Sequence, residues 1–338
     1  MNTEELRTVV ELATRAPSVH NTQPWRFAGR TAPDGDVEGV DVFADRERSL
    51  EVIDPEGRDL HLSCGAAVEF ARIGVRALGR SCSVHLLPER EQPDHLAWIE
   101  IGGGEPPTEE ELRLHAAVPD RYTARERFDD TPVPQDVVAR LEHAASELGA
   151  WLRVLGEKAD EVTLAVLLAR SDEIERHDER YEAELATWLN RPREAGDGIP
   201  PAAVVPTHER ASSLQLREME RKGGEDTPPK GAGGTEGATA PPPVEHPLVC
   251  IIGTPGDDRH AWLQAGEALG RLLLEAAAAG VQASPLTQVT EVASARAMLA
   301  GGLGLVGHPQ IVLRMGYAHG RPTTPRRPVE SVLDVPGR

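Results

Sequence analysis

The sequence predicts an α+β fold built from two tandem, pseudo-symmetric halves. Segments with the periodicity of amphipathic helices alternate with short strand-like runs along most of the 338 residues. Four residues recur at one constant offset of 201 positions (259 − 58 = 201): Arg58, Leu62, Gly65 and Gly79 match Arg259, Leu263, Gly266 and Gly280. In both halves the repeated helix leads through its glycine into a valine-containing strand. Duplication of one α+β unit explains this order, and the seam between two such units is a natural place for a ligand.

The first half is expected to open with a helix capped by Asn2 or Thr3. Acidic residues fill its first turn, an apolar stripe follows at helical spacing, and Pro17 stops it. "WRF" and "VDVFA" then indicate two short strands. A second helix is expected to be capped by Asp59 and to end at Gly79, before strands in "SVHLL" and "AWIEI".

The second half is expected to repeat this plan. A helix over residues 135–148 leads into the strand "WLRVL", and one long charged helix is predicted over 159–189. A strand in "LVCIIG", a helix closed by Gly280, a strand in "VQASPL", a short helix in "EVASARAMLA" and a strand in "PQIVLRMGYA" complete it. Between them, eleven of the 21 residues 223–243 are Gly or Pro, which predicts a flexible segment, more simply a passive linker than a functional element.

Composition and spacing exclude several classes of protein. A formal net charge of −19 argues against nucleic acid as the default partner. The twelve histidines are never closer than ten positions and no C-x-x-C occurs, so no local metal site is expected. Three separate cysteines, the opening "MNTEEL" without an apolar leader, and no apolar run of roughly 18 residues predict a cytoplasmic protein without a membrane partner. "GLGLVG" follows a helix and precedes a strand, the reverse of a dinucleotide-binding context, so we interpret it as a loop.

Three polar stretches are candidates for ligand binding. "PSVHNTQPW" places amide and hydroxyl groups in the turn between the first helix and strand. "RYTAR" alternates Arg121, Thr123 and Arg125, which point to one side of an extended segment and suit a phosphate. "TTPRRP" holds Arg326 and Arg327 between prolines. Taken singly, each also fits a structural role: backbone hydrogen bonds for the turn, and surface ion pairs for the arginines.

Together these stretches resemble the FMN-dependent nitroreductase family. "RAPSVHNTQPWRF" is similar to that family's A-P-S-x-x-N-x-Q-P-W-x-F signature, and "RYTARERFDDTPV" resembles its R-x-S/T-x-R followed by Phe and Pro-Val. "SPLTQ" and "RPTTPRRPVESVL" look like a later flavin-contacting strand end and the basic C-terminal tail. More narrowly, the chain resembles the duplicated, single-chain branch related to mycobacterial Acg proteins, in which one polypeptide mimics the family's homodimer.

The resemblance implies a nitroreductase-like fold with antiparallel-rich sheets flanked by helices. Residues 1–110 would form a degenerate first half and residues 111–338 the second, with a Gly/Pro-rich insertion or lid at about 191–245. The first half has no R-x-S/T-x-R and the second has no P-S-x-x-N-x-Q turn, so one complete flavin site per chain is expected instead of two. The chain would be a monomer that acts as a pseudo-dimer, and whether it pairs again is open.

The resemblance also assigns roles to positions. Arg121 and Thr123 would hold the FMN phosphate and ribityl chain together with Arg326 and Arg327, and Arg125 would lie near N1 and O2 of the flavin. The turn residues that would close over the flavin are Pro17, Ser18, Asn21 and Gln23. The residues that would bring backbone groups to N5 are Pro285, Leu286, Thr287 and Gln288. No residue of the chain is expected to act as a nucleophile, because the flavin carries the chemistry.

The function implied is two-electron, ping-pong transfer from NAD(P)H through FMN to a small acceptor such as a nitroaromatic compound or a quinone. Two other classes stay open. One is a protein that sequesters or stores FMN under a lid with little or no reductase activity, and the other is a flavin-free scaffold. The sequence names neither the acceptor nor the choice between NADH and NADPH.

Overall fold

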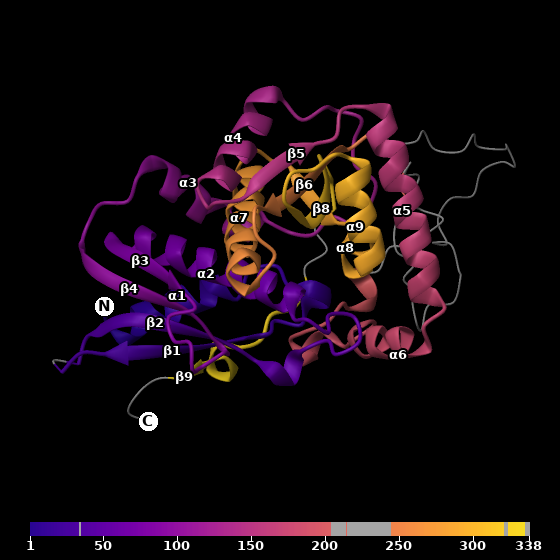
Figure 1. The fold of residues 1–338 in the computed structure, drawn as a ribbon. Helices are drawn as coiled ribbons and strands as arrows, with labels where there is room; N and C mark the ends of the chain where they lie inside the picture. Colours follow the sequence, from indigo (N-terminus) through magenta and orange to yellow (C-terminus); the bar gives the residue numbers. More distant parts are fainter. Residues whose placement is uncertain (34, 204–213, 215–244, 321–323, 335–338) are drawn as a thin grey trace, which may run out of the picture.

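Two sheets, each flanked by helices, make up the chain in a computed structural model (Figure 1). The structure describes residues 1–33, 35–203, 214, 245–320 and 324–334. The segment 223–243 that was predicted to be flexible lies outside the described residues. The first sheet has the order β3-β4-β2-β1-β9, with β1 (Trp25–Thr31), β2 (Val37–Ala44), β3 (Arg80–Leu86), β4 (His95–Gly104) and β9 (Leu333–Asp334). The second has the order β5-β6-β8-β7, with β5 (Trp151–Val154), β6 (Leu248–Thr254), β7 (Gln282–Pro285) and β8 (His308–Gly316).

The two sheets share one topology. If β1 to β4 are matched with β5 to β8 in chain order, the neighbours β3-β4-β2-β1 correspond to β7-β8-β6-β5, and every one of these pairs is antiparallel. In each half one 20-residue helix joins the second strand to the third, α2 (Arg58–Ala77) or α7 (Arg259–Ala278). This is the α+β arrangement that the repeat predicts. The boundary at residue 110 stays a prediction. The end of the second half returns to the first sheet, because β9 pairs in parallel with β1 through Leu333 and Phe27.

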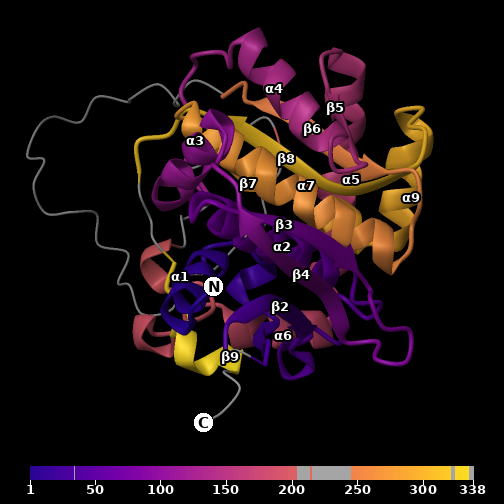
Figure 2. The ribbon, with the colours of Figure 1, turned by 90° about the vertical axis from the view of Figure 1, so that its left-hand side faces the viewer.

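Helices α2 and α7 cross between the two sheets (Figure 2), and the repeated glycines lie at the crossing. A Cβ atom on Gly65 would lie 2.2 Å from the carbonyl oxygen of Leu263, and one on Gly266 would lie 2.3 Å from that of Leu62. The contact is therefore reciprocal, as between two copies of one unit, and it depends on the absence of side chains. The repeated arginines are reciprocal too: Arg58 donates to the Gln310 carbonyl of the second half, and Arg259 donates to the Pro93 carbonyl of the first.

The remaining helices refine the predicted elements. They are α1 (Thr3–Ala13), α3 (Glu109–Ala117), α4 (Gln135–Ser146), α5 (Lys158–Arg176), α6 (Glu179–Trp188), α8 (Gln288–Glu291) and α9 (Ala293–Gly302). Asn2 caps α1 as expected, in a capping box with Glu5. The single helix predicted over 159–189 is wrong, because the Asp178 side chain accepts two backbone N–H groups and starts α6 as a new helix. Asp59 does not cap α2, since that position is held by Gly57 with a φ of 75°.

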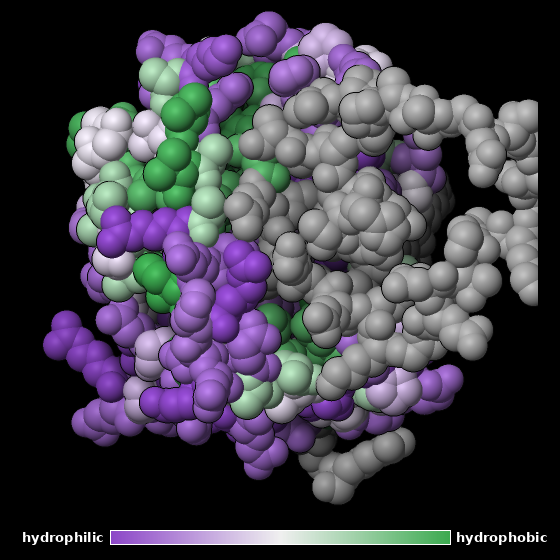
Figure 3. Space-filling view, turned by 90° about the vertical axis from the view of Figure 1, so that its right-hand side faces the viewer, coloured by the Kyte–Doolittle hydropathy of each residue, from purple (hydrophilic) through white to green (hydrophobic). Residues whose placement is uncertain are grey.

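Helix α6 belongs to the second half of the sequence but packs against residues of the first half. Its Tyr181 and Leu185 pack in one apolar cluster with Leu50 and Ile53 of the first half. On the face that carries α5 and α6, the described surface that stays in view is mostly hydrophilic in its lower part and mixed with apolar side chains above (Figure 3). None of the helices in the described part of the chain combines the length and the apolar character needed to cross a bilayer.

A buried acidic residue at the α2–α7 seam makes stability depend on pH. Burial and the nearby Glu69 carboxylate raise the pKa of Glu267 to about 8, while Glu69 itself is paired with Arg72 and Arg271 at 2.7 and 2.8 Å. The folded state therefore keeps a proton that the unfolded chain releases above its ordinary pKa of about 4.3. Because the folded pKa is the higher one, this proton's contribution to stability is complete at low pH and is lost as pH rises through about 8.

Replacing Glu267 by glutamine is expected to remove this dependence. At pH 9 the Glu267→Gln variant should be more stable than the unaltered protein by roughly 4 kcal/mol, and at pH 5 the two should be nearly equal. Urea unfolding at the two pH values measures the difference. The exposed Glu142→Gln change on α4 is the control. An equal gain at both pH values would show that Glu267 is ionised in the folded protein.

Candidate functional site

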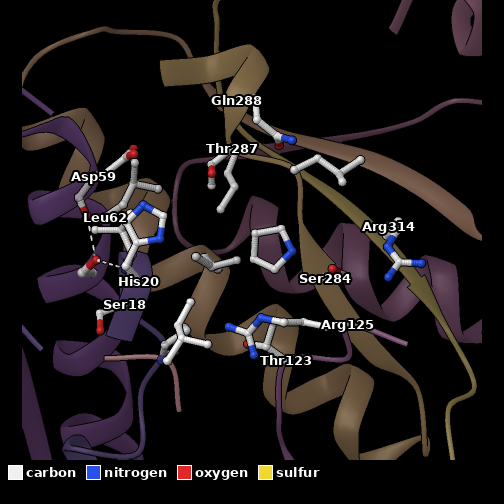
Figure 4. Close-up of a pocket in the computed structure, with 18 residues that line it drawn as sticks. Ser18, His20, Asp59, Leu62, Thr123, Arg125, Ser284, Thr287, Gln288 and Arg314 are labelled. Atoms are coloured by element: carbon white, nitrogen blue, oxygen red, sulfur yellow. Dashed lines mark hydrogen bonds between the residues drawn. The ribbon is translucent and has the colours of Figure 1, made fainter. Parts of the chain in front are cut away.

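A cleft lies between the two halves, and residues of both halves line it. The first half supplies one wall, from the turn after α1 and from the start of α2: Pro17, Ser18, Val19, His20, Asp59, Leu62 and Ser63. The second half supplies the other: Thr123, Arg125, Leu269, Ser284, Pro285, Leu286, Thr287, Gln288, Ile311 and Arg314. Figure 4 shows the labelled members of the two walls facing each other. Apolar walls with a few convergent polar groups are typical of cofactor and small-molecule sites.

The segment 121–125 reaches the cleft because it lies along the edge strand β7. The Ala124 N–H donates to the Ala283 carbonyl at 3.0 Å, and Thr123 forms a parallel bridge with Ala283. The Gln282 side chain accepts from the Tyr122 N–H at 3.2 Å. The segment is thus extended, so its alternate residues share a side. Thr123 and Arg125 line the cleft as this alternation predicts.

Arginine side chains from three parts of the chain gather beside the cleft. Arg121 Nη2 and Arg326 Nη2 both donate to the backbone carbonyl of Arg15, each at 3.3 Å. Burial and the neighbouring guanidinium groups of Arg125 and Arg15 lower the pKa of Arg121 to about 10, and burial with Arg121, Arg15 and Arg125 lowers that of Arg326 to about 9. Like charges held this close are unfavourable unless an anion joins them.

The donors of this arginine cluster (Arg15, Arg121, Arg125 and Arg326) suit a phosphate. Among the residues that the structure describes, no carboxylate forms an ion pair with Arg121 or Arg326. The Nε atoms of these two side chains are buried and have no hydrogen-bond partner within the described residues. Guanidinium groups bind phosphate oxygens through charge-assisted hydrogen bonds, so a phosphate here would satisfy the donors and offset the repulsion.

Five of the predicted site residues do not line the cleft: Arg121 and Arg326, which lie in the arginine cluster, and Asn21, Gln23 and Arg327. Asn21 Nδ2 donates to the carbonyls of Gly198 and Pro325 at 2.9 and 3.1 Å, and Gln23 Nε2 donates to the Gly196 carbonyl at 2.8 Å. Gln23 Oε1 accepts from the Arg327 N–H at 2.9 Å, and the Arg327 guanidinium pairs with Asp45 at 3.1 Å. These groups join the turn to two distant segments, so in this structure they hold backbone. Their contact with a cofactor stays a prediction.

The predicted residues at the end of β7 all reach the cleft. Pro285, Leu286, Thr287 and Gln288 line it, and Figure 4 shows Thr287 and Gln288 on the wall opposite Ser18 and His20. The Leu286 N–H, however, donates to the Val312 carbonyl at 2.8 Å, which engages that group within the sheet. We therefore expect a cofactor to meet the side chains and the remaining backbone of this strand end.

Sequence reasoning missed several residues of the cleft. Arg314 on β8 is fully buried and pairs with Glu245 at 2.5 Å, and its guanidinium lies 4.7 Å from the centre of the Phe128 ring. Asp59 is 6% exposed and pairs with Arg58 at 2.6 Å. The only available signal was the unusual position of these charges in otherwise apolar segments. Ile199, from the region 191–245 predicted to be an insertion, also lines the cleft.

The fold and the cleft define an α+β protein of two similar halves with a candidate ligand site between them, and comparisons with known proteins identify its family. No family model matches the chain. A protein of Mycobacterium tuberculosis H37Rv named "Putative NAD(P)H nitroreductase Rv3131" is 34% identical over 98% of this chain and 92% of its own length. "Putative NAD(P)H nitroreductase acg" from the same organism is 29% identical over 99% of this chain and 97% of its own length. The chain belongs to the NAD(P)H nitroreductase family, in the group that includes these mycobacterial proteins.

Likeness to solved structures is weaker. The crystal structure of the "FMN and NADPH-dependent nitroreductase NfnB" from Sphingopyxis sp. strain HMH matches 67% of this chain and 99% of that chain at 14% identity. The TM-score is 0.42.

Proposed function

We propose that the protein binds FMN in the cleft and transfers two electrons from NAD(P)H to a small acceptor such as a nitroaromatic compound or a quinone. The observation that carries the proposal is the pair Arg121 and Arg326 beside a cleft with apolar walls: within the described residues their buried Nε atoms have no hydrogen-bond partner and no carboxylate pairs with either side chain. A ligand with a phosphate at one end and a flat ring at the other complements both features. The names of the relatives support the same class of reaction.

Each part of the cleft has a role in this proposal. Arg121 and Arg326 hold the phosphate, while Thr123 and Arg125 lie along the path toward the ring. Bound FMN supplies the capacity to take up and pass on two electrons. A permanently charged guanidinium beside the ring stabilises negative charge there at any working pH, a task that suits Arg125. The walls formed by Leu62, Leu286 and Ile311 exclude water from the ring.

The first test is an anaerobic mixing experiment with FMN-loaded protein. The flavin absorbance band is followed while NADPH, and then NADH, is added. Bleaching within seconds by either nicotinamide supports the reductase, and an acceptor that restores the band completes the cycle. Titration with FMN is expected to give one flavin per chain, because the cleft takes one wall from the first half and one from the second. A protein that binds no FMN would contradict the proposal.

A second candidate function is FMN sequestration without rapid turnover. The observation in its favour is that the described start of the region 191–245 lies against the cleft: Ile199 lines it, and Asn21 and Gln23 bind the carbonyls of Gly198 and Gly196. The anaerobic experiment separates the two functions. Flavin that dithionite reduces but neither nicotinamide reduces would favour sequestration.

A further inference from the structure

The turn that follows α1 has a strained backbone. His20, Asn21 and Gln23 have φ angles of 46°, 58° and 52°, and they are three of the five non-glycine residues with positive φ in the described chain. Residues other than glycine pay for this left-handed conformation in free energy, on the order of 1 kcal/mol each. Such strain persists only where surrounding contacts impose it, and it concentrates at functional sites.

Contacts from both halves impose the strain. The Ser18 hydroxyl accepts from the Gln23 N–H at 2.9 Å, and the Ser63 hydroxyl accepts from the Val19 N–H at 3.2 Å. The Asn21 and Gln23 amides anchor the other side of the turn to residues 196, 198 and 325. The turn is thereby held against α2. One consequence is that His20, although only 7% exposed, has its side chain on the wall of the cleft (Figure 4).

His20 differs chemically from the other polar residues of the cleft. Asp59 is paired with Arg58, and Arg314 is paired with Glu245. Guanidinium groups do not release protons at working pH, and serine and threonine hydroxyls are far weaker acids. Of the residues that line the described cleft, His20 alone carries a group whose ordinary titration falls near neutral pH. A strained, anchored turn thus presents the residue type best suited to proton transfer.

We propose that His20 donates a proton to the electron acceptor bound in the cleft. This inference rests on the proposed function. With a quinone, NAD(P)H supplies two electrons and one hydrogen as a hydride equivalent, which forms one O–H bond of the hydroquinone. The imidazolium N–H bond breaks to give the proton of the second O–H bond, and the neutral imidazole regains a proton from water. The products are hydroquinone and oxidised nicotinamide, with one proton consumed overall.

Several charged groups lie on the elements that surround His20. From α2, Asp59 lines the same wall, and its ion-pair partner is Arg58. From the opposite wall, Arg125 and Arg314 line the cleft. Helix α6 packs beside the turn, and its Glu184 carboxylate accepts the Val52 and Ile53 N–H groups. Because these acidic groups are engaged with other partners, the protonation of His20 is tested directly. The test compares an acceptor that takes up protons with one that takes up electrons only.

The variant His20→Asn is the sharpest test, because asparagine tolerates the left-handed conformation better than other side chains and cannot donate a proton as an acid. FMN-loaded protein is assayed with two acceptors, a quinone that takes up protons and ferricyanide, which takes electrons alone. We expect kcat/KM for the quinone to fall by about 100-fold, within the usual range for a lost general acid. Ferricyanide reduction should fall much less. The exposed His143→Asn change on α4 is the matched control.

Two measurements keep the inference testable if the variant folds poorly. In the unaltered protein, the ratio of quinone to ferricyanide rates should decline as pH rises through an imidazole titration between about pH 5.5 and 8. Binding of nitrobenzoate to the oxidised protein, measured by calorimetry without turnover, should be about tenfold tighter at pH 6 than at pH 8, and this difference should vanish in His20→Asn. A flat rate ratio, or equal loss with both acceptors, would overturn the role of His20. Failure of the proposed function itself would appear earlier, as unaltered protein that binds no FMN or is not reduced by a nicotinamide.

Discussion

Replacing Gly266 by alanine is expected to lower the free energy of unfolding by about 3 kcal/mol or more. The new Cβ would lie 2.3 Å from the Leu62 carbonyl oxygen and 2.9 Å from the Gly65 Cα, and neither backbone atom can rotate away. The two central helices would have to separate, which would open the seam on which both halves pack. Gly65→Ala should have a similar effect, because its Cβ would lie 2.2 Å from the Leu263 oxygen. Urea unfolding of each variant measures the loss.

Gly74→Ala is the matched control for Gly65→Ala, because both glycines lie on α2. Its Cβ would meet no atom closer than 3.5 Å, so alanine should leave stability unchanged or raise it by up to about 1 kcal/mol through its better helix propensity. The double variant Gly65→Ala/Gly266→Ala should cost less than the sum of the single changes, because one separation of the helices accommodates both. Simple additivity, or wild-type stability of either single variant, would show that α2 and α7 do not cross in this close contact.

Replacing Arg121 or Arg326 by glutamine is expected to weaken FMN binding by about 10- to 100-fold for each residue. Each change removes a charge-assisted contact of roughly 1.5–3 kcal/mol with the phosphate. Burial, and after it the neighbouring guanidinium groups, lower the pKa of Arg121 to about 10 and that of Arg326 to about 9. The same change removes this buried, repelled charge, so the FMN-free variants should melt at a higher temperature than the FMN-free parent. A loss of affinity together with a gain in stability is the signature of a ligand site in place of a structural ion pair.

Riboflavin provides the matched ligand because it lacks the phosphate. Its affinity should change little in Arg121→Gln and Arg326→Gln, and the exposed Arg90→Gln should change neither affinity. Fluorescence titration with the two flavins measures both quantities. If riboflavin and FMN lost affinity equally, the arginines would act on the shape of the cleft, and the assignment of the phosphate to them would be rejected.

Much of the fold could be predicted from local patterns. The capping box at Asn2, the alternating strand runs and the glycines at positions 79 and 280, both with a φ of 73°, are determined by neighbouring residues. Prediction failed where a local interaction competed with periodicity. The charged pattern over 159–189 continues through Asp178, and the capping bonds of that residue are what divide α5 from α6.

The candidate site divides in the same way. The sequence by itself determined which segments carry ligand-binding chemistry, because the spacing of Arg121, Thr123 and Arg125 fixes which side chains share a face of an extended strand. Only the tertiary structure decided which groups meet. It brings Arg326 to Arg121, turns Asn21 and Gln23 toward backbone carbonyls, and places His20 and Arg314 on opposite walls of one cleft. These outcomes depend on the crossing of α2 and α7, a contact between residues 201 positions apart that no local pattern of hydrophobicity or charge can specify.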